Sequence, residues 1–121
     1  MSAALWAGVA LLGGLGAVAR LFGEHGVRRQ LNVTFPIGTT VVNITGAFAL
    51  GLLTALGVSH TVTVLLGTGF LGAYTTFSGW MLETRAEAES KRFGAAATNI
   101  AVSAVLGLAA AALGYWLGRL I

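Results

Sequence analysis

The chain has 121 residues, of which 56% are hydrophobic and only 9% are charged. Soluble domains carry about a quarter charged residues, so this composition argues against a water-soluble globule and indicates that lipid surrounds the protein. The net charge of +3 comes from a few basic residues between apolar stretches, which is typical of membrane–water boundaries rather than of a nucleic-acid surface. The lack of cysteine excludes thiol and disulfide chemistry.

Four long apolar stretches follow one another along the chain. Each has roughly twenty residues or more, which is enough for a helix to cross the hydrocarbon core of a bilayer. Their hydrophobic residues are continuous rather than alternating, which argues against strands. Short connections join them, so we expect one all-α domain over residues 1–121, as a multi-pass protein of the cell (inner) membrane. The predicted transmembrane helices are 3–22, 37–56, 61–82 and 94–117.

The connections between these stretches differ in charge. All basic residues except Arg119 lie in or beside the connections that follow the first and third stretches. Positively charged loops tend to stay in the cytoplasm, which predicts that both termini lie outside. Four small helices enclose little volume, so we also expect that a pathway for a substrate requires a second copy of the chain.

The third stretch contains Gly67–Gly72, GTGFLG, which fits the dinucleotide-binding pattern G-x-G-x-x-G. No strand precedes this segment and it lies inside a predicted span, so nucleotide binding has almost no support. The glycines, followed by Ala73–Thr76, instead predict a break in the helix at mid-membrane. A break leaves backbone carbonyls free, and such carbonyls can coordinate a cation.

Uncharged polar residues lie inside three of the stretches, and the pattern places no carboxylate deep in any of them. Thr39 and Asn43 share one face of the second predicted helix, and Asn99 and Ser103 share one face of the fourth. Polar groups in lipid need partners. These residues either hold helices together or form a track of neutral donors along which a small anion passes without being trapped, and the residues alone leave both explanations open.

Three segments together resemble the Fluc (CrcB) fluoride channels. They are GFLGAYTTFSGW over 69–80, GTTVVNITG over 38–46 and GGLGAVAR over 13–20, and the similarity in length and motif order covers essentially the whole chain. The resemblance implies an antiparallel, dual-topology homodimer with two pores that passively export fluoride and so lower its cytoplasmic concentration. It also implies a structural sodium ion, Na+, at the dimer interface in the break of the third helix.

The same resemblance implies roles for individual residues. The implied sodium ligands are the backbone carbonyls of Gly72 and Thr75, and Arg20 is implied to be structural or to line the pore vestibule. The chain departs from the family pattern where Trp80 replaces a second pore phenylalanine and where Asn99 replaces a frequent tyrosine. The implied fluoride pathway comprises Thr39, Asn43, Phe77, Trp80, Asn99 and Ser103.

Two other functions stay open as alternatives. A small proton-coupled exporter, also a dual-topology dimer, needs an ionisable residue within the membrane, whereas all four glutamates flank the predicted spans. A non-transporting assembly subunit would use the glycines and amides only for helix packing. An enzyme is not expected, because no activated nucleophile or acid–base pair is evident. The uneven charge also fits a heterodimer with an oppositely oriented paralogue.

Overall fold

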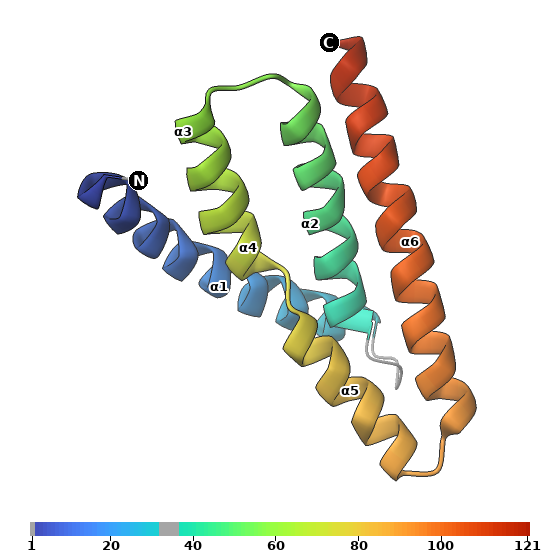
Figure 1. Cartoon of the computed structure of the whole chain (residues 1–121). Coiled ribbons are helices and arrows are strands. Elements are labelled where there is room, and N and C mark those ends of the chain that lie inside the picture. The colour runs from blue at the N-terminus through green and yellow to red at the C-terminus, as the bar shows by residue number, and fades with distance from the viewer. Residues whose placement is uncertain (1, 32–36) are drawn as a thin grey trace.

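The computed structural model describes residues 2–31 and 37–121, and within these ranges the chain is helical with short connections. Figure 1 shows the helices along the chain and the positions of its two ends. The expectation of an all-α protein is confirmed. The elements are α1 (Ala3–Leu31), α2 (Ile37–Ala55), α3 (His60–Val62), the π-helix η1 (Thr63–Leu71), α4 (Gly72–Tyr74), α5 (Phe77–Glu89) and α6 (Phe93–Leu120).

Within the described ranges, three helices are long and apolar enough to cross a membrane: α1, α2 and α6. Helix α1 continues past residue 22, where its apolar stretch ends, and keeps the following charged residues in the same helix as far as Leu31. Arginine, glutamate and glutamine are good helix formers, so a helix does not stop where its hydrophobic surface stops. At about 1.5 Å per residue, α1 is longer than the hydrocarbon core of about 30 Å.

The third crossing consists of two helical pieces, which confirms the predicted break. The segments α3, η1 and α4 follow one another from His60 to Tyr74. Thr75 and Thr76 are extended, with ψ angles of 158° and 114°, and the chain changes direction there before α5 begins (Figure 1). The hydroxyl of Thr76 accepts a hydrogen bond of 3.0 Å from the N–H of Gly79, and this bond caps α5. The break therefore lies directly after the glycine-rich segment.

Helices α2 and α6 pack along each other (Figure 1) because glycines face the backbone of the partner helix. A Cβ atom on Gly51 would overlap the carbonyl oxygen of Ala111, and a Cβ atom on Gly114 would overlap the carbonyl oxygen of Phe48. Small residues at a helix crossing let two backbones approach closely, and this close packing is a main source of helix association in lipid.

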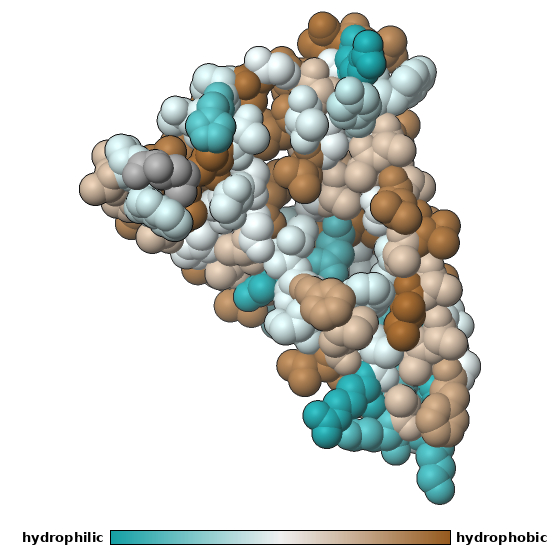
Figure 2. Space-filling view, in the orientation of Figure 1, coloured by the Kyte–Doolittle hydropathy of each residue, from teal (hydrophilic) through white to brown (hydrophobic). Residues whose placement is uncertain are grey.

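Most large apolar side chains point away from the protein. Val42 and Leu53 are buried, whereas Leu11, Phe22 and Leu108 are 73%, 73% and 74% exposed. In Figure 2, hydrophobic surface follows α6, and hydrophilic surface gathers where α5 turns into α6. An apolar exterior of this extent is compatible with lipid and not with water. The chain is a multi-pass membrane protein, as predicted.

The turn between α5 and α6 places a lysine in the left-handed region of backbone conformation. Lys91 has a φ of 60°, and the N–H of Arg92 donates a hydrogen bond of 2.9 Å to the carbonyl of Glu87. The turn requires this conformation at the residue that follows the last helical turn, where glycine is preferred because it has no Cβ.

Replacing Lys91 by glycine is therefore expected to stabilise the protein by about 0.5–1 kcal/mol, since the strain of a left-handed side chain exceeds the extra entropy of unfolded glycine. Lys91→Ala is the matched control, because it removes the charge but keeps the Cβ. Thermal unfolding in detergent measures the difference. Equal midpoints for the two variants would show that the side chain, not the backbone, determines the effect.

Candidate functional site at the broken helix

Asn43 on α2 binds the backbone at the break. Its side-chain Nδ2 donates a hydrogen bond of 3.1 Å to the carbonyl of Thr76, and its Oδ1 accepts a hydrogen bond of 2.8 Å from the N–H of the same residue. The N–H of Thr76 would otherwise lack a partner, because the preceding helix ends before it. One primary amide thus supplies a donor and an acceptor to the extended segment. The structure therefore places Asn43 at the break. That Asn43 contacts an anion stays a prediction.

The carbonyls of Gly72 and Thr75 lie at the same break. Since Asn43 accepts from the N–H of Thr76, that N–H does not close a helical turn onto the carbonyl of Gly72. In the described ranges, neither the backbone nor a side chain donates a hydrogen bond to the carbonyl oxygen of Gly72 or Thr75. Carbonyls at the end of a helix carry partial negative charge, and carbonyl oxygen is a suitable ligand for a hard cation.

Gly72 and Thr75 line a hollow of about 310 Å³ between α2 and the segments η1 and α4. Gly46 allows α2 to lie close to Thr75, because a Cβ atom at position 46 would overlap the methyl carbon Cγ2 of Thr75. Tyr74 fixes the adjacent turn by a hydrogen bond of 2.9 Å between its hydroxyl and that of Thr45. The hollow is lined by Asn43, Gly46, Ala47, Leu50, Gly67, Leu71, Gly72 and Thr75.

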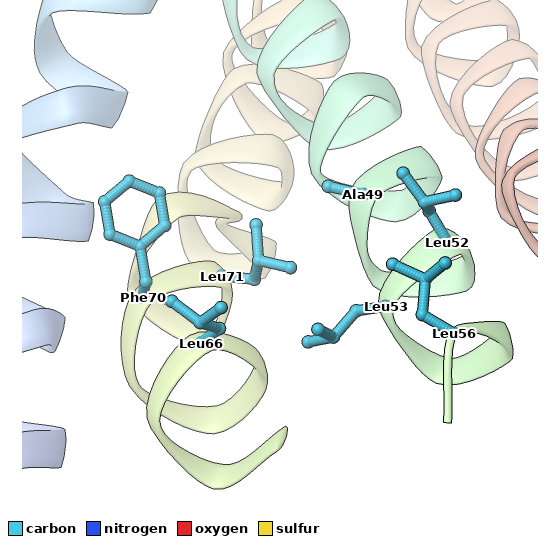
Figure 3. Close-up of a pocket in the computed structure, with 7 residues that line it drawn as sticks. All are labelled: Ala49, Leu52, Leu53, Leu56, Leu66, Phe70 and Leu71. Atoms are coloured by element: carbon cyan, nitrogen blue, oxygen red, sulfur yellow. The ribbon is translucent and has the colours of Figure 1, made fainter. Parts of the chain in front are cut away.

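An apolar hollow of about 250 Å³ adjoins this one and shares Leu71 with it. In Figure 3, Leu53 of α2 and Leu71 of η1 point toward each other across the space between the two helices. None of the lining side chains has a hydrogen-bonding group, so nothing here can replace the water around an ion. This hollow is therefore not part of an ion site. Its lining consists of Ala49, Leu52, Leu53, Leu56, Leu66, Phe70 and Leu71.

A polar hollow of about 240 Å³ lies on the other side of the break. The hydroxyl Oγ1 of Thr39 is 2.5 Å from Oε1 of Glu83 and 3.5 Å from Oε1 of Glu24. A hydroxyl has one proton, so it donates to one of these carboxylates at a time. Glu24, Glu83 and Arg20 thus line one small space. The lining comprises Arg20, Leu21, Glu24, Thr39, Thr76, Ser78, Gly79, Leu82 and Glu83.

The position of the glutamates corrects part of the sequence-based argument. We expected all of them to flank the spans, but Glu83 reaches Thr39, which is 2% exposed, and Glu87 is 5% exposed. Glu87 is paired with Arg92 by a contact of 2.8 Å between Oε2 and Nη2. The reason is geometric: Glu83 and Glu87 lie four positions apart on α5, so both face the same side of the helix, toward the protein interior.

Asn99 joins α6 to α5 inside the protein. It is completely buried, and its Nδ2 donates a hydrogen bond of 2.8 Å to the hydroxyl of Thr84. Its Oδ1 accepts from Ser103 at 3.4 Å, and the hydroxyl of Ser103 lies 3.4 Å from that of Thr40 on α2. The structure thus brings the predicted pair Asn99 and Ser103 together. Thr40 and Thr84 were missed, because a lone threonine in an apolar stretch commonly bonds only to its own helix.

Phe77 and Trp80 stand together on the first turn of α5. Their ring centroids are 5.7 Å apart with an angle of 81° between the ring planes, which is an edge-to-face contact. Phe77 is 71% exposed, whereas the indole Nε1 of Trp80 donates a hydrogen bond of 3.3 Å to the carbonyl of Asn99. The N–H of Trp80 is therefore bound within the protein.

The predicted residues thus fall into three groups around one break. Gly72, Thr75 and Asn43 lie at the break itself. Arg20 and Thr39 line the polar hollow, and Thr76 connects the two groups, because it bonds to Asn43 and also lines that hollow. The remaining four residues lie at or near the contact of α5 with α6, namely Phe77, Trp80, Asn99 and Ser103.

Comparison with known proteins gives the family. A family model described as "CrcB-like protein, Camphor Resistance (CrcB)" matches residues 7–115. The chain belongs to the CrcB family. Within the family it is similar to the "Fluoride-specific ion channel FluC 2" of Mycobacterium tuberculosis, with 51% identity over 120 residues that cover 99% of this chain and 95% of that protein. The resemblance that the motifs suggested is therefore confirmed.

Two further relatives bear similar names. The "Fluoride-specific ion channel FluC 2" of Mycolicibacterium paratuberculosis is 50% identical over 118 residues, covering 98% of this chain and 97% of that protein. The "Fluoride-specific ion channel FluC 1" of Symbiobacterium thermophilum is 45% identical over 119 residues, covering 93% of this chain and 96% of that protein. Each match covers nearly the full length of this chain and of the relative, so it includes all three groups of predicted site residues.

Proposed function

We propose that this chain is a fluoride-specific ion channel of the cell membrane, which passively exports fluoride and lowers its cytoplasmic concentration. The observation that carries the proposal is the 51% identity, over 99% of the chain, to a protein of that name. Fluoride is small and strongly hydrated, so a pathway has to replace its water with hydrogen-bond donors and aromatic edges. The hydroxyl of Ser78 and the ring edge of Phe77 offer such groups beside the break.

The direct test is fluoride efflux from liposomes that contain the purified chain, with chloride as the control anion. Rapid efflux of fluoride and not of chloride supports the proposal. A folded protein that releases neither anion, alone or together with an oppositely oriented paralogue, would refute it. A channel makes and breaks no covalent bond, and the names of the relatives accordingly agree with the expectation that the chain is not an enzyme.

We also propose that the carbonyls of Gly72 and Thr75 hold a structural sodium ion. Support comes from their position at the break, from the 310 Å³ hollow beside them and from the lack of a competing hydrogen bond among the described residues. When bound, the ion would supply positive charge next to the polar hollow. Gly46 and Asn43 hold the carbonyls in place, the first by allowing close approach and the second by binding Thr76.

Sodium is expected to stabilise the folded protein by about 2–3 kcal/mol at a concentration of about one hundred times its dissociation constant. Thermal unfolding in sodium chloride and in N-methylglucamine chloride measures this effect. Gly46→Ala should reduce it, because the added Cβ would displace Thr75, whereas Gly14→Ala should not, since no atom lies within 4 Å of its Cβ position. Equal stability in both salts would refute the sodium site.

The functional unit that we propose is an antiparallel dimer. The two hollows at the break, of about 310 and 240 Å³, are small in a single copy, and Gly72 is exposed there, where a second copy can contribute the same carbonyls. The partner is either a second copy or a paralogue of opposite orientation. The uneven charge of the connections suits a paralogue, and so do the names of the relatives, which number their channels 1 and 2. Efflux from the chain reconstituted alone, compared with efflux after co-expression of a paralogue, separates these two arrangements.

One observation keeps the proton-coupled exporter as a second candidate. Glu24 and Glu83 face Thr39 in the polar hollow, so ionisable groups do lie close to the proposed pathway. An exporter of this kind exchanges protons for its substrate, whereas a channel does not. Fluoride efflux that is unchanged by an imposed pH gradient, after correction for hydrogen fluoride diffusion, favours the channel. A flux that reverses with the pH gradient favours the exporter.

A further inference from the structure

Helix α5 carries the aromatic residues of the proposed pathway, but the break separates it from the first half of the third crossing. Within the described ranges, its main packing partner is α6. Whatever fixes α5 against α6 therefore also fixes Phe77 and Trp80 relative to the rest of the pathway. The sequence places at this contact an asparagine, Asn99, where the resembled family often has tyrosine, and a tryptophan where it has phenylalanine.

The hydrogen bonds at this contact form a closed circuit. The carbonyl of Asn99 accepts from Nε1 of Trp80 at 3.3 Å, and the Nδ2 of Asn99 donates to the hydroxyl of Thr84 at 2.8 Å. The hydroxyl of Thr84 in turn donates to the carbonyl of Trp80 at 2.9 Å. Both the side chain and the backbone of Trp80 are thus tied to Asn99. Asn99 has no exposed surface at all, and Thr84 is 9% exposed.

This burial and this bonding disagree with a direct contact between Asn99 and an anion. The amide donates one of its two N–H groups to Thr84, its oxygen accepts from Ser103, and no part of Asn99 is exposed to an anion. The indole N–H of Trp80 is also occupied, so what Trp80 can present to an anion is the edge of its ring. Its edge-to-face contact with Phe77, at 5.7 Å, then couples the two rings.

We propose that Asn99 is a positioning residue for Trp80: through Thr84 and its own carbonyl it fixes α5 against α6, so that the two aromatic rings are held in place and the indole N–H is not offered to the anion. This inference rests on the proposed fluoride channel function. Asn99 is then a supporting residue and not a ligand of the anion pathway. This also explains why Trp80 and Asn99 occur together in one chain, because the indole N–H and the asparagine amide both form bonds at the contact of α5 with α6.

The test uses the full chain in which Trp6→Phe and Trp116→Phe leave Trp80 as the remaining tryptophan. Thr84→Val removes the hydroxyl and keeps the shape, and Asn99→Leu removes the amide. Each is expected to change the emission and the near-ultraviolet circular dichroism of Trp80. Thr54→Val on α2 is the matched control, because its hydroxyl bonds only to its own helix on the exposed surface, at 2.8 Å from the carbonyl of Leu50.

Fluoride efflux from liposomes gives the second readout. Thr84→Val should reduce efflux about tenfold in the parent chain, because misplaced rings lose their alignment with the pathway. In a Trp80→Phe background the indole N–H bond to the carbonyl of Asn99 is already absent, although the bonds of Thr84 remain, so the same change should reduce efflux by no more than about twofold. Unchanged Trp80 spectra in folded Thr84→Val and Asn99→Leu proteins would overturn the proposal. So would equal losses of efflux in the two backgrounds.

The spectra do not depend on transport. If the parent chain proves to conduct no fluoride, the proposed function fails, while the Trp80 spectra still decide whether Asn99 positions the indole. Should Asn99→Leu fail to fold, Thr84→Val alone gives both readouts, because valine has nearly the shape of threonine.

Discussion

Replacing Gly114 by alanine is expected to destabilise the folded protein by about 3 kcal/mol or more, because an added Cβ has no space at the contact of α6 with α2. The new methyl group would overlap the carbonyl oxygen of Phe48 and would lie 3.0 Å from the backbone nitrogen of Leu52. Both obstacles are backbone atoms, so no side chain can rotate away and the helices have to separate. In lipid, separation removes the close packing that holds them together.

Gly107→Ala is the matched control on the same helix. No atom lies within 4 Å of the Cβ position of Gly107, and alanine is favoured over glycine in a helix by about 1 kcal/mol. Its stability should be equal to that of the parent chain or slightly higher. Thermal unfolding followed by circular dichroism in detergent measures both variants. If both substitutions lowered the midpoint alike, close packing at Gly114 would not be the cause.

Asn43→Ala is expected to reduce fluoride efflux at least about tenfold and to destabilise the protein by about 2–4 kcal/mol, because it leaves the N–H of Thr76 without a partner and removes the side-chain bond to its carbonyl. These two bonds, of 2.8 and 3.1 Å, are the ones that fix the extended segment to α2. Without them the carbonyls of Gly72 and Thr75 lose their defined position as well. The sodium-dependent part of the stability should therefore fall together with the efflux.

Asn43→Asp separates the structural role from the electrostatic one. The carboxylate keeps an acceptor for the N–H of Thr76 but loses the donor to its carbonyl, so the stability should lie between that of the parent and that of Asn43→Ala. The added negative charge should nevertheless abolish efflux of an anion. Efflux from Asn43→Asp above that from Asn43→Ala would contradict this account. The exposed Thr54→Val serves as the unaffected control.

The break in the third crossing shows how far local sequence information reaches. Glycines at 67, 69 and 72 followed by two threonines predict a weak point in any helix, because glycine and β-branched residues have low helix propensity. That prediction requires no knowledge of neighbouring helices, and the structure places the break at Thr75 and Thr76. The partner of the break, Asn43, lies more than thirty positions away in the chain, and no local pattern connects it with Thr76.

The surroundings of the glutamates, in contrast, could not be predicted from local sequence. In the sequence, Glu83 follows an apolar stretch and has the position of a boundary residue, which led us to place no carboxylate deep in a span. The structure brings Glu83 to Thr39 and Glu24, because α1, α2 and α5 converge there. A list of hydrophobic stretches contains no information about which helix ends meet. For the same reason the sequence singled out Asn99 but not its partner Thr84.

The sequence by itself determined that lipid surrounds this protein, that it is helical, where its third crossing breaks and to which family it belongs. Those properties follow from composition, from hydrophobic length and from motifs of adjacent residues, all of which act over short stretches of chain. Only the tertiary structure decided which polar groups satisfy one another: Asn43 with Thr76, Thr39 with Glu83, and Asn99 with Thr84 and Trp80. Buried polar groups need partners, but the identity of each partner depends on how the helices cross, and that is fixed by the close contact of glycines such as Gly51 and Gly114 with a neighbouring backbone.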